Sequence, residues 1–106
     1  MKVFIGQTVW SDGVSGQTLV RSRGENVFME IHDQWGSDWS GTLQRSGSAL
    51  SGLVKSGGIY VVQVVATLSE REDGSLLISG TWRETNNVEK NKNYTFTTTL
   101  IHTRGD

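Results

Sequence analysis

The sequence predicts an all-β protein, an eight-stranded antiparallel up-and-down meander closed into a barrel. Apolar and polar residues alternate along eight short segments, and helical periodicity is almost absent. The turns between the segments are short and rich in Gly, Asn, Asp and Ser, which favours antiparallel neighbours. Eight is also about the number of strands at which a closed barrel is just filled by side chains or holds one small ligand. A two-sheet sandwich is the alternative architecture.

Length and composition narrow the class of protein. The 106 residues, numbered 1–106, fit a single β-barrel domain. There is no cysteine, so disulfides and cysteine-ligated zinc are excluded. The net charge is −1 and the charges are mixed along the chain, which argues against nucleic-acid and membrane partners. We expect a cytoplasmic protein, with secretion after removal of a signal peptide as the alternative.

The first half of the chain predicts five strands. The third of them shows the pattern clearly, because Val27, Met29 and Ile31 lie on one face and more polar residues lie between them. The expected segments are Lys2 to Trp10, Gly16 to Arg21, Asn26 to His32, Asp38 to Arg45 and Ala49 to Lys55.

The second half predicts three strands and one longer loop. The expected strands are Ile59 to Leu68, Leu76 to Glu84 and Tyr94 to Thr103. The polar stretch Asn86 to Asn93 predicts the loop that joins the last two strands.

Three glycines favour the barrel over the sandwich. Gly41, Gly52 and Gly80 each fall in mid-strand on the apolar face. Glycine inside a strand weakens it and marks a bend or a close approach, and a small barrel needs such positions to curve. Trp39 and Trp82 lie two residues from these glycines on the same side, which predicts core or cavity-wall positions for both.

Two hairpins resemble the avidin and streptavidin family of barrels. The motifs are Trp39-Ser40-Gly41-Thr42-Leu43 after an apolar strand, and Leu77-Ile78-Ser79-Gly80-Thr81-Trp82 followed by Tyr94 to His102. The similarity extends over about residues 16 to 103 and implies a cavity-forming barrel. The biotin site does not carry over, because Leu43 and Arg45 stand where the family has a tyrosine and a small hydroxyl residue.

The resemblance also implies a permuted order of strands. The family continues with one more strand where this chain ends, and this chain has an additional strand, Lys2 to Trp10, at its start. In a closed meander with an even number of strands the first and last strands are neighbours. We therefore expect a circularly permuted avidin-like topology, in which the first strand takes the missing place.

Aromatic residues are the candidate ligand-binding residues. Trp39 and Trp82 are expected in the core or cavity wall, together with Tyr94 and Phe96. Trp10 and Trp35 flank turns that contain Asp, Ser and Gly. An indole ring beside polar groups suits a sugar or a protein surface. The alternative is that Trp10 and Trp35 seal the mouths of the barrel.

The two histidines, His32 and His102, are the candidate catalytic or metal-binding residues. Glu30 shares a strand face with His32, and such a pair can transfer protons. If the side chains turn inward, Glu30, His32 and His102 form a metal triad. The alternative, which we favour, is that His32 and Glu30 lie on a solvated face. We therefore expect no catalytic residue, no metal and no cofactor.

The strand Ile59 to Leu68 is apolar on both faces. Val61 and Val65 oppose the inner-facing residues, with Gln63 between them. A strand that is apolar on both sides is typically buried on both sides. We therefore expect a homodimer through this strand, with an exposed patch on a monomer as the alternative.

These observations rank three functions. A non-catalytic barrel that binds a small molecule, other than biotin, in its interior or mouth comes first. A lectin-like, carbohydrate-binding surface, or a protein-binding inhibitor surface, built on the loop tryptophans comes second. A small enzyme that uses Glu30 and His32 comes third. Fold does not decide among them.

Overall fold

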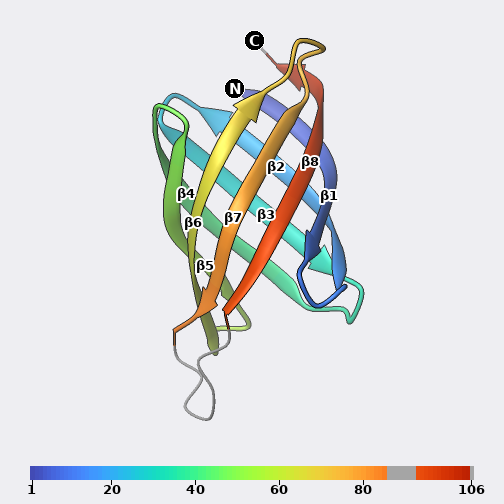
Figure 1. Cartoon of the computed structure of the whole chain (residues 1–106), viewed down its shortest axis with the longest axis vertical. Coiled ribbons are helices and arrows are strands. Elements are labelled where there is room, and N and C mark those ends of the chain that lie inside the picture. The colour runs from blue at the N-terminus through green and yellow to red at the C-terminus, as the bar shows by residue number, and fades with distance from the viewer. Residues whose placement is uncertain (86–92, 106) are drawn as a thin grey trace.

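Eight antiparallel strands run in sequence order around a closed barrel (Figure 1). The computed structural model describes residues 1–85 and 93–105. The strands are β1 (Lys2–Trp10), β2 (Ser15–Arg23), β3 (Asn26–Asp33), β4 (Asp38–Ser46), β5 (Ala49–Ser56), β6 (Tyr60–Glu70), β7 (Leu76–Glu84) and β8 (Asn93–Gly105). Within the described residues no helix is long and apolar enough to cross a bilayer.

The barrel closes through the first and last strands. β1 pairs with β2 on one side and with β8 on the other, from Lys2 opposite Gly105 to Trp10 opposite Phe96. This pairing confirms the predicted closed meander and excludes the two-sheet sandwich. Most strands extend one or two residues beyond the predicted limits, since turn residues continue the pairing. β6 begins at Tyr60, so Ile59 belongs to the preceding turn and not to the strand. The predicted loop from Asn86 lies outside the described residues, except for Asn93, which begins β8.

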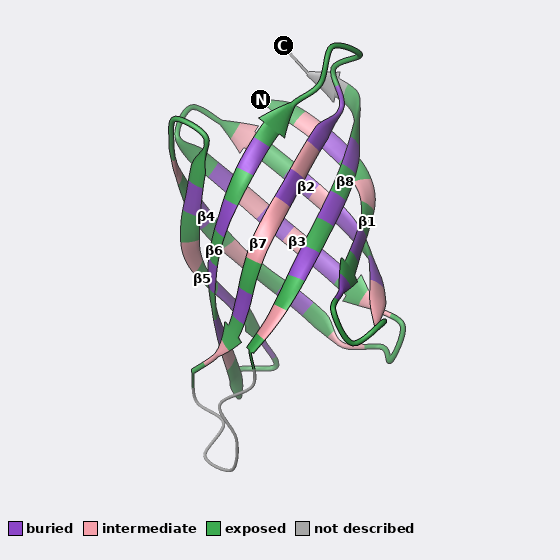
Figure 2. Cartoon of the chain, viewed as in Figure 1, coloured by how far each residue is buried: buried purple, intermediate pink, exposed green. Residues whose placement is uncertain are grey.

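The interior is filled by apolar side chains. Burial alternates along every strand whose side chains are described throughout, and Figure 2 shows this as alternating bands. The largest buried apolar side chains with almost no exposed surface are Met29, Ile31, Leu43, Leu50, Ile78 and Leu100. Each such side chain contributes about 1.5–3 kcal/mol when removed from water. The middle of the barrel is therefore a packed core.

Glycines allow the strands to approach one another. A Cβ on Gly80 would lie 2.1 Å from the carbonyl oxygen of Val65, and one on Gly41 would lie 2.1 Å from that of Leu53. No side chain fits there without moving the neighbouring backbone. The prediction that mid-strand glycines mark close approaches is confirmed.

Three buried threonines form a hydroxyl chain between β8, β1 and β2. The Oγ1 of Thr8 lies 2.6 Å from that of Thr98 and 2.7 Å from that of Thr18. Thr18 donates to the carbonyl of Gly16 at 3.4 Å, so Thr8 must donate to Thr18 and Thr98 to Thr8. Every hydroxyl proton then has an acceptor, which permits these polar groups inside an apolar core.

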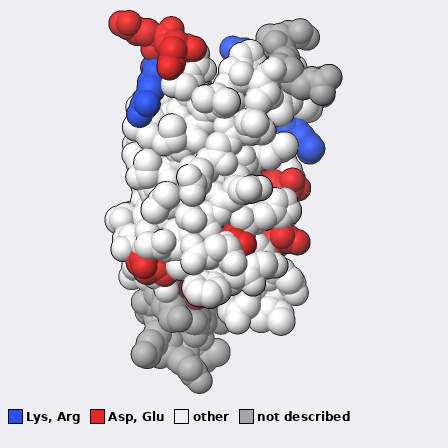
Figure 3. Space-filling view, turned by 90° about the vertical axis from the view of Figure 1, so that its right-hand side faces the viewer, with Lys and Arg blue, Asp and Glu red and all other residues white. Residues whose placement is uncertain are grey.

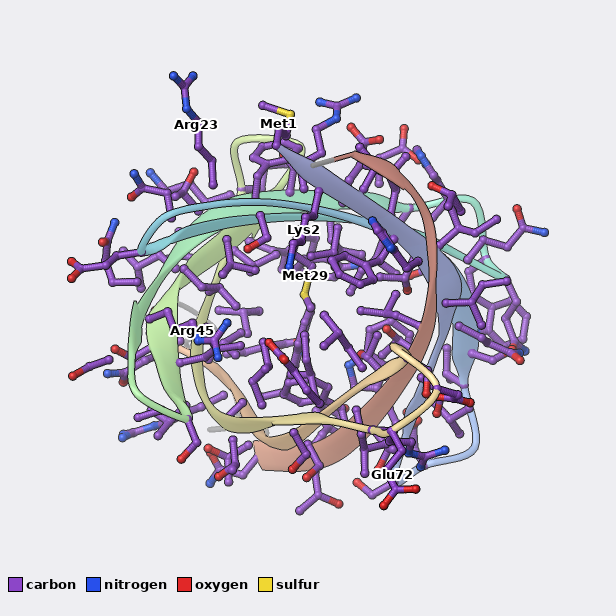
Figure 4. The ribbon with its side chains drawn as sticks, turned by 90° about the horizontal axis from the view of Figure 1, so that it is seen from above. Met1, Lys2, Arg23, Met29, Arg45 and Glu72 are labelled. Atoms are coloured by element: carbon purple, nitrogen blue, oxygen red, sulfur yellow. The ribbon has the colours of Figure 1, made fainter. Side chains whose placement is uncertain are left out.

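The two ends of the barrel differ. One end, which we name the terminal end, carries the start of β1, the end of β8 and the turns after β2, β4 and β6 (Figure 1). Figure 4 looks into this end, with Lys2 and Arg45 at the opening and Met29 pointing toward the axis. The opposite end receives the last residues of odd strands and the first residues of even strands. We name it the tryptophan end, for the residues described next.

Candidate ligand-binding site

One pocket at the tryptophan end is lined by all four tryptophans of the chain. Its volume is about 180 Å³. The lining residues are Trp10, Trp35, Trp39, Trp82, Tyr94, Val14, Asp12, Asp33 and Glu84. The pocket is smaller than the about 300–1,000 Å³ typical of sites for drug-sized ligands.

Strand direction brings these residues together. Trp10 ends β1 and Trp82 lies near the end of β7, whereas Trp39 lies near the start of β4. In an antiparallel meander the ends of odd strands and the starts of even strands meet at one rim. The register then places Tyr94 opposite Trp82 and Phe96 opposite Trp10.

Trp82 is the centre of an aromatic cluster beneath the pocket. Its ring centroid lies 5.2 Å from Trp10, 5.3 Å from Trp39 and 5.8 Å from Phe96, with interplanar angles of 74–78°. Edge-to-face pairs of this kind contribute about 0.5–1.5 kcal/mol each beyond their burial. Trp39 and Trp82 are buried, as predicted. Phe96 is also buried and packs on Trp82 without lining the pocket.

Trp10 is not a surface residue. Only 7% of it is exposed, because it continues the inward alternation of Phe4 and Thr8 to the last position of β1. Of the two interpretations given for Trp10, its burial agrees with a place inside the mouth of the barrel and not with an exposed loop surface. Its Nε1–H is buried and has no hydrogen-bond acceptor among the residues that the structure describes.

Trp35 is the exposed wall of the pocket. It is 74% exposed and lies in the turn between β3 and β4. Asp33 holds this turn, because its Oδ1 accepts the backbone N–H groups of Trp35 and Ser37, both at 2.9 Å. Its Oδ2 accepts the indole N–H of Trp39 at 3.2 Å. One carboxylate therefore fixes both an exposed and a buried tryptophan.

The charged residues of the pocket are all acidic. Asp12, Asp33 and Glu84 line it, and no Lys, Arg or His belongs to its described lining. Asp12 Oδ1 accepts the backbone N–H of Val14 at 3.0 Å, which orders the first turn. The electrostatic potential of such a site disfavours anions. The sequence pattern pointed to the aromatic residues, but the carboxylates were missed as part of the site because they lie on three different turns or strand ends.

Glu30 and His32 lie on the outer face, away from this pocket. His32 Nδ1 is 2.5 Å from Asp38 and its Nε2 is 3.8 Å from Glu30. The hydrogen bond to Asp38, together with the negative charges of both carboxylates, raises the pKa of His32 above 6.5. Both ring nitrogens thus face carboxylates in an exposed ion pair.

The metal triad does not form. His102 lies on β8 and its ring packs 5.0 Å from Phe4, whereas β1 and β2 separate it from His32 on β3. Among residues 1–85 and 93–105 no group of three His, Cys, Asp or Glu side chains is arranged to hold a metal ion.

A wider hollow lies on the outside of the barrel. It measures about 890 Å³ and runs over β1, β2, β3 and β8. Its lining includes the apolar residues Ile5, Leu19 and Ile101, and also Glu30 and His32. Figure 3 faces this side of the barrel and shows few charged side chains on it. The hollow is open and its lining contains no tryptophan, so it lacks the concentration of rings found at the tryptophan end.

Comparison with known proteins adds no relative. No family model matches the chain, and no curated protein matches it.

Proposed function

We propose that this protein is a non-catalytic binding protein that takes a small molecule other than biotin at the mouth of its barrel. The observation that carries the proposal is the convergence of all four tryptophans on one pocket of about 180 Å³. Aromatic walls with a few polar groups are typical of small-molecule sites.

Packing favours the mouth over the interior as the place of binding. Met29, Leu43 and Ile78 are fully buried in the middle of the barrel and occupy the space that a ligand would need. At the mouth, Trp35 is exposed and ready to contact a ligand without rearrangement of the core.

Two features support binding rather than catalysis. The pocket lining that the structure describes contains no histidine, and the Asp33 carboxylate accepts three hydrogen bonds, two from the backbone of the following turn and one from Trp39 on β4. His32 lies outside this pocket, and its Nδ1 is hydrogen-bonded to Asp38.

The test uses the indole N–H signals of the four tryptophans. In ¹⁵N-labelled protein these signals are assigned by single Trp→Phe variants and followed during titration with a fragment set of small neutral rings, amines and acids. We expect shifts at Trp10 and Trp35 with some fragments. If no fragment moves either signal at millimolar concentration, the proposed function is wrong. Native mass spectrometry of freshly purified protein adds the mass of any ligand that is retained.

We also propose that the barrel is of the avidin type with a permuted strand order. The support is that β1 lies between β8 and β2, where the family's final strand would stand. A variant that joins residue 106 to Met1 by a short linker and opens the chain at Gly13 should therefore fold, because Lys2 and Gly105 are already paired. Failure of this variant to give a cooperative thermal transition would contradict the permutation.

Self-association through β6 remains our expectation. Val65 is 53% exposed in the middle of β6, and Tyr60 is exposed at the start of the same strand. Leu53 is exposed on the neighbouring strand β5. Val65→Glu should convert a dimer into a monomer in sedimentation velocity, whereas Ile101→Glu on β8, two strands away from β6, should not. A wild-type protein that is monomeric at high concentration contradicts the expectation.

A further inference from the structure

We infer that the ligand of the pocket is a small organic cation, an ammonium group with alkyl substituents that lies against the ring of Trp35. This inference rests on the proposed function and specifies its ligand class. Three observations carry it: the pocket is walled by aromatic rings, its charged side chains have a single sign, and most of its polar groups already have hydrogen-bond partners within the protein.

Aromatic rings form the larger part of the pocket wall. The four tryptophans and Tyr94 line it, and the exposed ring of Trp35 can be reached without movement of the core. The face of an aromatic ring carries negative electrostatic potential, and tryptophan is the ring that attracts cations most strongly. Alkyl groups on the nitrogen also contact the rings as apolar surface. An alkylated ammonium group is therefore attracted both by its charge and by its carbon atoms.

The charged side chains of the lining are all negative. Asp12, Asp33 and Glu84 line the pocket, and no Lys, Arg or His does so among the described residues. Within the described part of the chain neither Asp12 nor Asp33 is in an ion pair, since the ion pairs there join His32 and Arg45 to other carboxylates. On the face drawn in Figure 3 the visible charged side chains of the lower half, toward this end of the barrel, are acidic, whereas the Lys and Arg side chains lie in the upper half. Coulomb attraction therefore favours a cation at this mouth and disfavours an anion.

Hydrogen bonds within the protein distinguish a cation from a neutral polyol. Both oxygens of Asp33 accept N–H groups of the protein, and Asp12 Oδ1 accepts the backbone N–H of Val14. The indole N–H of Trp39 donates to Asp33, and the indole nitrogen of Trp10 is buried out of reach of a ligand in the pocket. A neutral polyol would have to compete for these groups, whereas a carboxylate still attracts a cation when its oxygens are already bonded. The site therefore favours a cation.

The same contacts favour an organic cation over a metal ion. Hard metal ions take several oxygen ligands at once. In residues 1–85 and 93–105 no three His, Cys, Asp or Glu side chains are arranged to hold a metal ion. An alkylated ammonium group needs no such coordination. The pocket volume of about 180 Å³ equals about six water molecules at roughly 30 Å³ each, which suits one ammonium head group with its substituents.

The experiment compares choline with an uncharged molecule of the same shape on the intact protein. In dimethylbutanol a carbon atom replaces the nitrogen of choline, so the pair differs in charge alone. The indole N–H signals of Trp10 and Trp35 report binding, and methyl glucoside and acetate represent neutral sugars and anions. We expect choline to shift both signals and to bind at least about fivefold more tightly than dimethylbutanol, as one cation–π contact and the carboxylates require.

Salt provides a second test of the charge. Raising NaCl from about 0.01 to 1 M shortens the Debye length from about 30 to about 3 Å. The affinity for choline should fall over this range, and the affinity for dimethylbutanol should not. Equal salt dependence of the two would overturn the assigned role of the charge.

Variants locate the contacts. Trp35→Leu keeps an apolar side chain at an exposed position and removes the ring, so choline affinity should fall at least about threefold with little change for dimethylbutanol. Asp12→Asn keeps an oxygen for the Val14 N–H and removes the charge, so choline affinity should fall about two- to fivefold. Glu72→Gln removes the same charge at the terminal end of the barrel, where Figure 4 labels this residue, and should leave the affinity unchanged.

The outcomes separate the inference from the function on which it rests. If dimethylbutanol, methyl glucoside or acetate binds as tightly as choline, the cation assignment is overturned and the small-molecule function stands. Undiminished choline binding by Trp35→Leu, or equal effects of Asp12→Asn and Glu72→Gln, overturns the assigned contacts and with them this inference. If neither these probes nor the fragment set move the two signals, both proposals fall.

Discussion

Replacing Thr8 with valine removes the middle member of the buried hydroxyl chain. Valine has nearly the same shape as threonine, so the change tests hydrogen bonding rather than packing. The substitution removes two hydrogen bonds, of 2.6 and 2.7 Å, and leaves the proton of the buried Thr98 without an acceptor. At about 1 kcal/mol per net hydrogen bond, with a further contribution from the orphaned group, we expect a loss of about 2–3 kcal/mol in the free energy of unfolding.

The direction of the hydrogen bonds from Thr98 to Thr8 to Thr18 predicts how much stability each related variant loses. Thr98→Val removes only a donor, and Thr8 keeps Thr18 as its acceptor, so the loss should be about 1 kcal/mol. The triple variant with valine at positions 8, 18 and 98 leaves no hydroxyl unpaired. Its stability should return to within about 1 kcal/mol of the wild type, because replacing all partners by apolar groups of the same shape is nearly neutral.

Urea unfolding followed by tryptophan fluorescence and circular dichroism measures these differences. The slope of free energy against urea must stay constant among the variants for the comparison to hold. For a domain of this size, Thr8→Val should lower Tm by at least about 8 °C. A triple variant less stable than Thr8→Val would refute the reasoning, because the hydroxyls would then act independently of one another.

Three further perturbations follow from the described contacts. Gly80→Ala places a methyl group 2.1 Å from the carbonyl oxygen of Val65, so the barrel should lose about 3 kcal/mol or more in thermal or urea unfolding. The raised pKa of His32 means that its contribution to stability is complete below about pH 6.5 and is lost as pH rises through the folded-state pKa. His32→Gln should flatten that part of a stability profile measured from about pH 5.5 to 8.5. Asp33→Ala removes acceptors from the turn and from Trp39, with an expected loss of about 2 kcal/mol by urea unfolding.

Each of these has a contrary result. An Ala variant at Gly80 that melts like the wild type would mean that β6 and β7 do not approach as closely as described. If His32→Gln left the stability profile unchanged, the contacts of His32 with Asp38 and Glu30 would not be the cause of the loss of stability with rising pH. If Asp33→Ala left stability unchanged, the turn would be held by something other than this carboxylate.

Local alternation was sufficient to predict the strands. In the segment from Asn26, Val27, Met29 and Ile31 face inward as predicted, because a one-residue slip would turn all three toward water. The same rule also assigns Trp10 to the inside, whereas its position beside a turn left a surface role equally open. The alternation of inward and outward side chains along the strand was the better guide, because the turn begins only after Trp10, the last inward-facing residue of β1.

The site required long-range information. Trp10, Trp35, Trp39 and Trp82 meet because the meander closes and its strands start and end at common rims, which no short motif encodes. The hydroxyl chain was hidden for the same reason. In the sequence Thr8 is an ordinary strand threonine. Only the strand register shows that it lies beside Thr98, 90 residues later in the sequence.

The closure by β1 and β8 also determines when the barrel can form. Thr103 donates to the carbonyl of Val3 across a sequence separation of 100 residues, so the final seam depends on contacts between the first and the last strand. Folds dominated by such distant pairings reach the native state in about milliseconds to seconds. At a translation rate of about 5–20 residues per second, β8 is synthesised about 5 s or more after β1. During that interval β1 and β7 present unpaired edges, and the nascent chain is most open to pairing with other chains just before its last strand arrives.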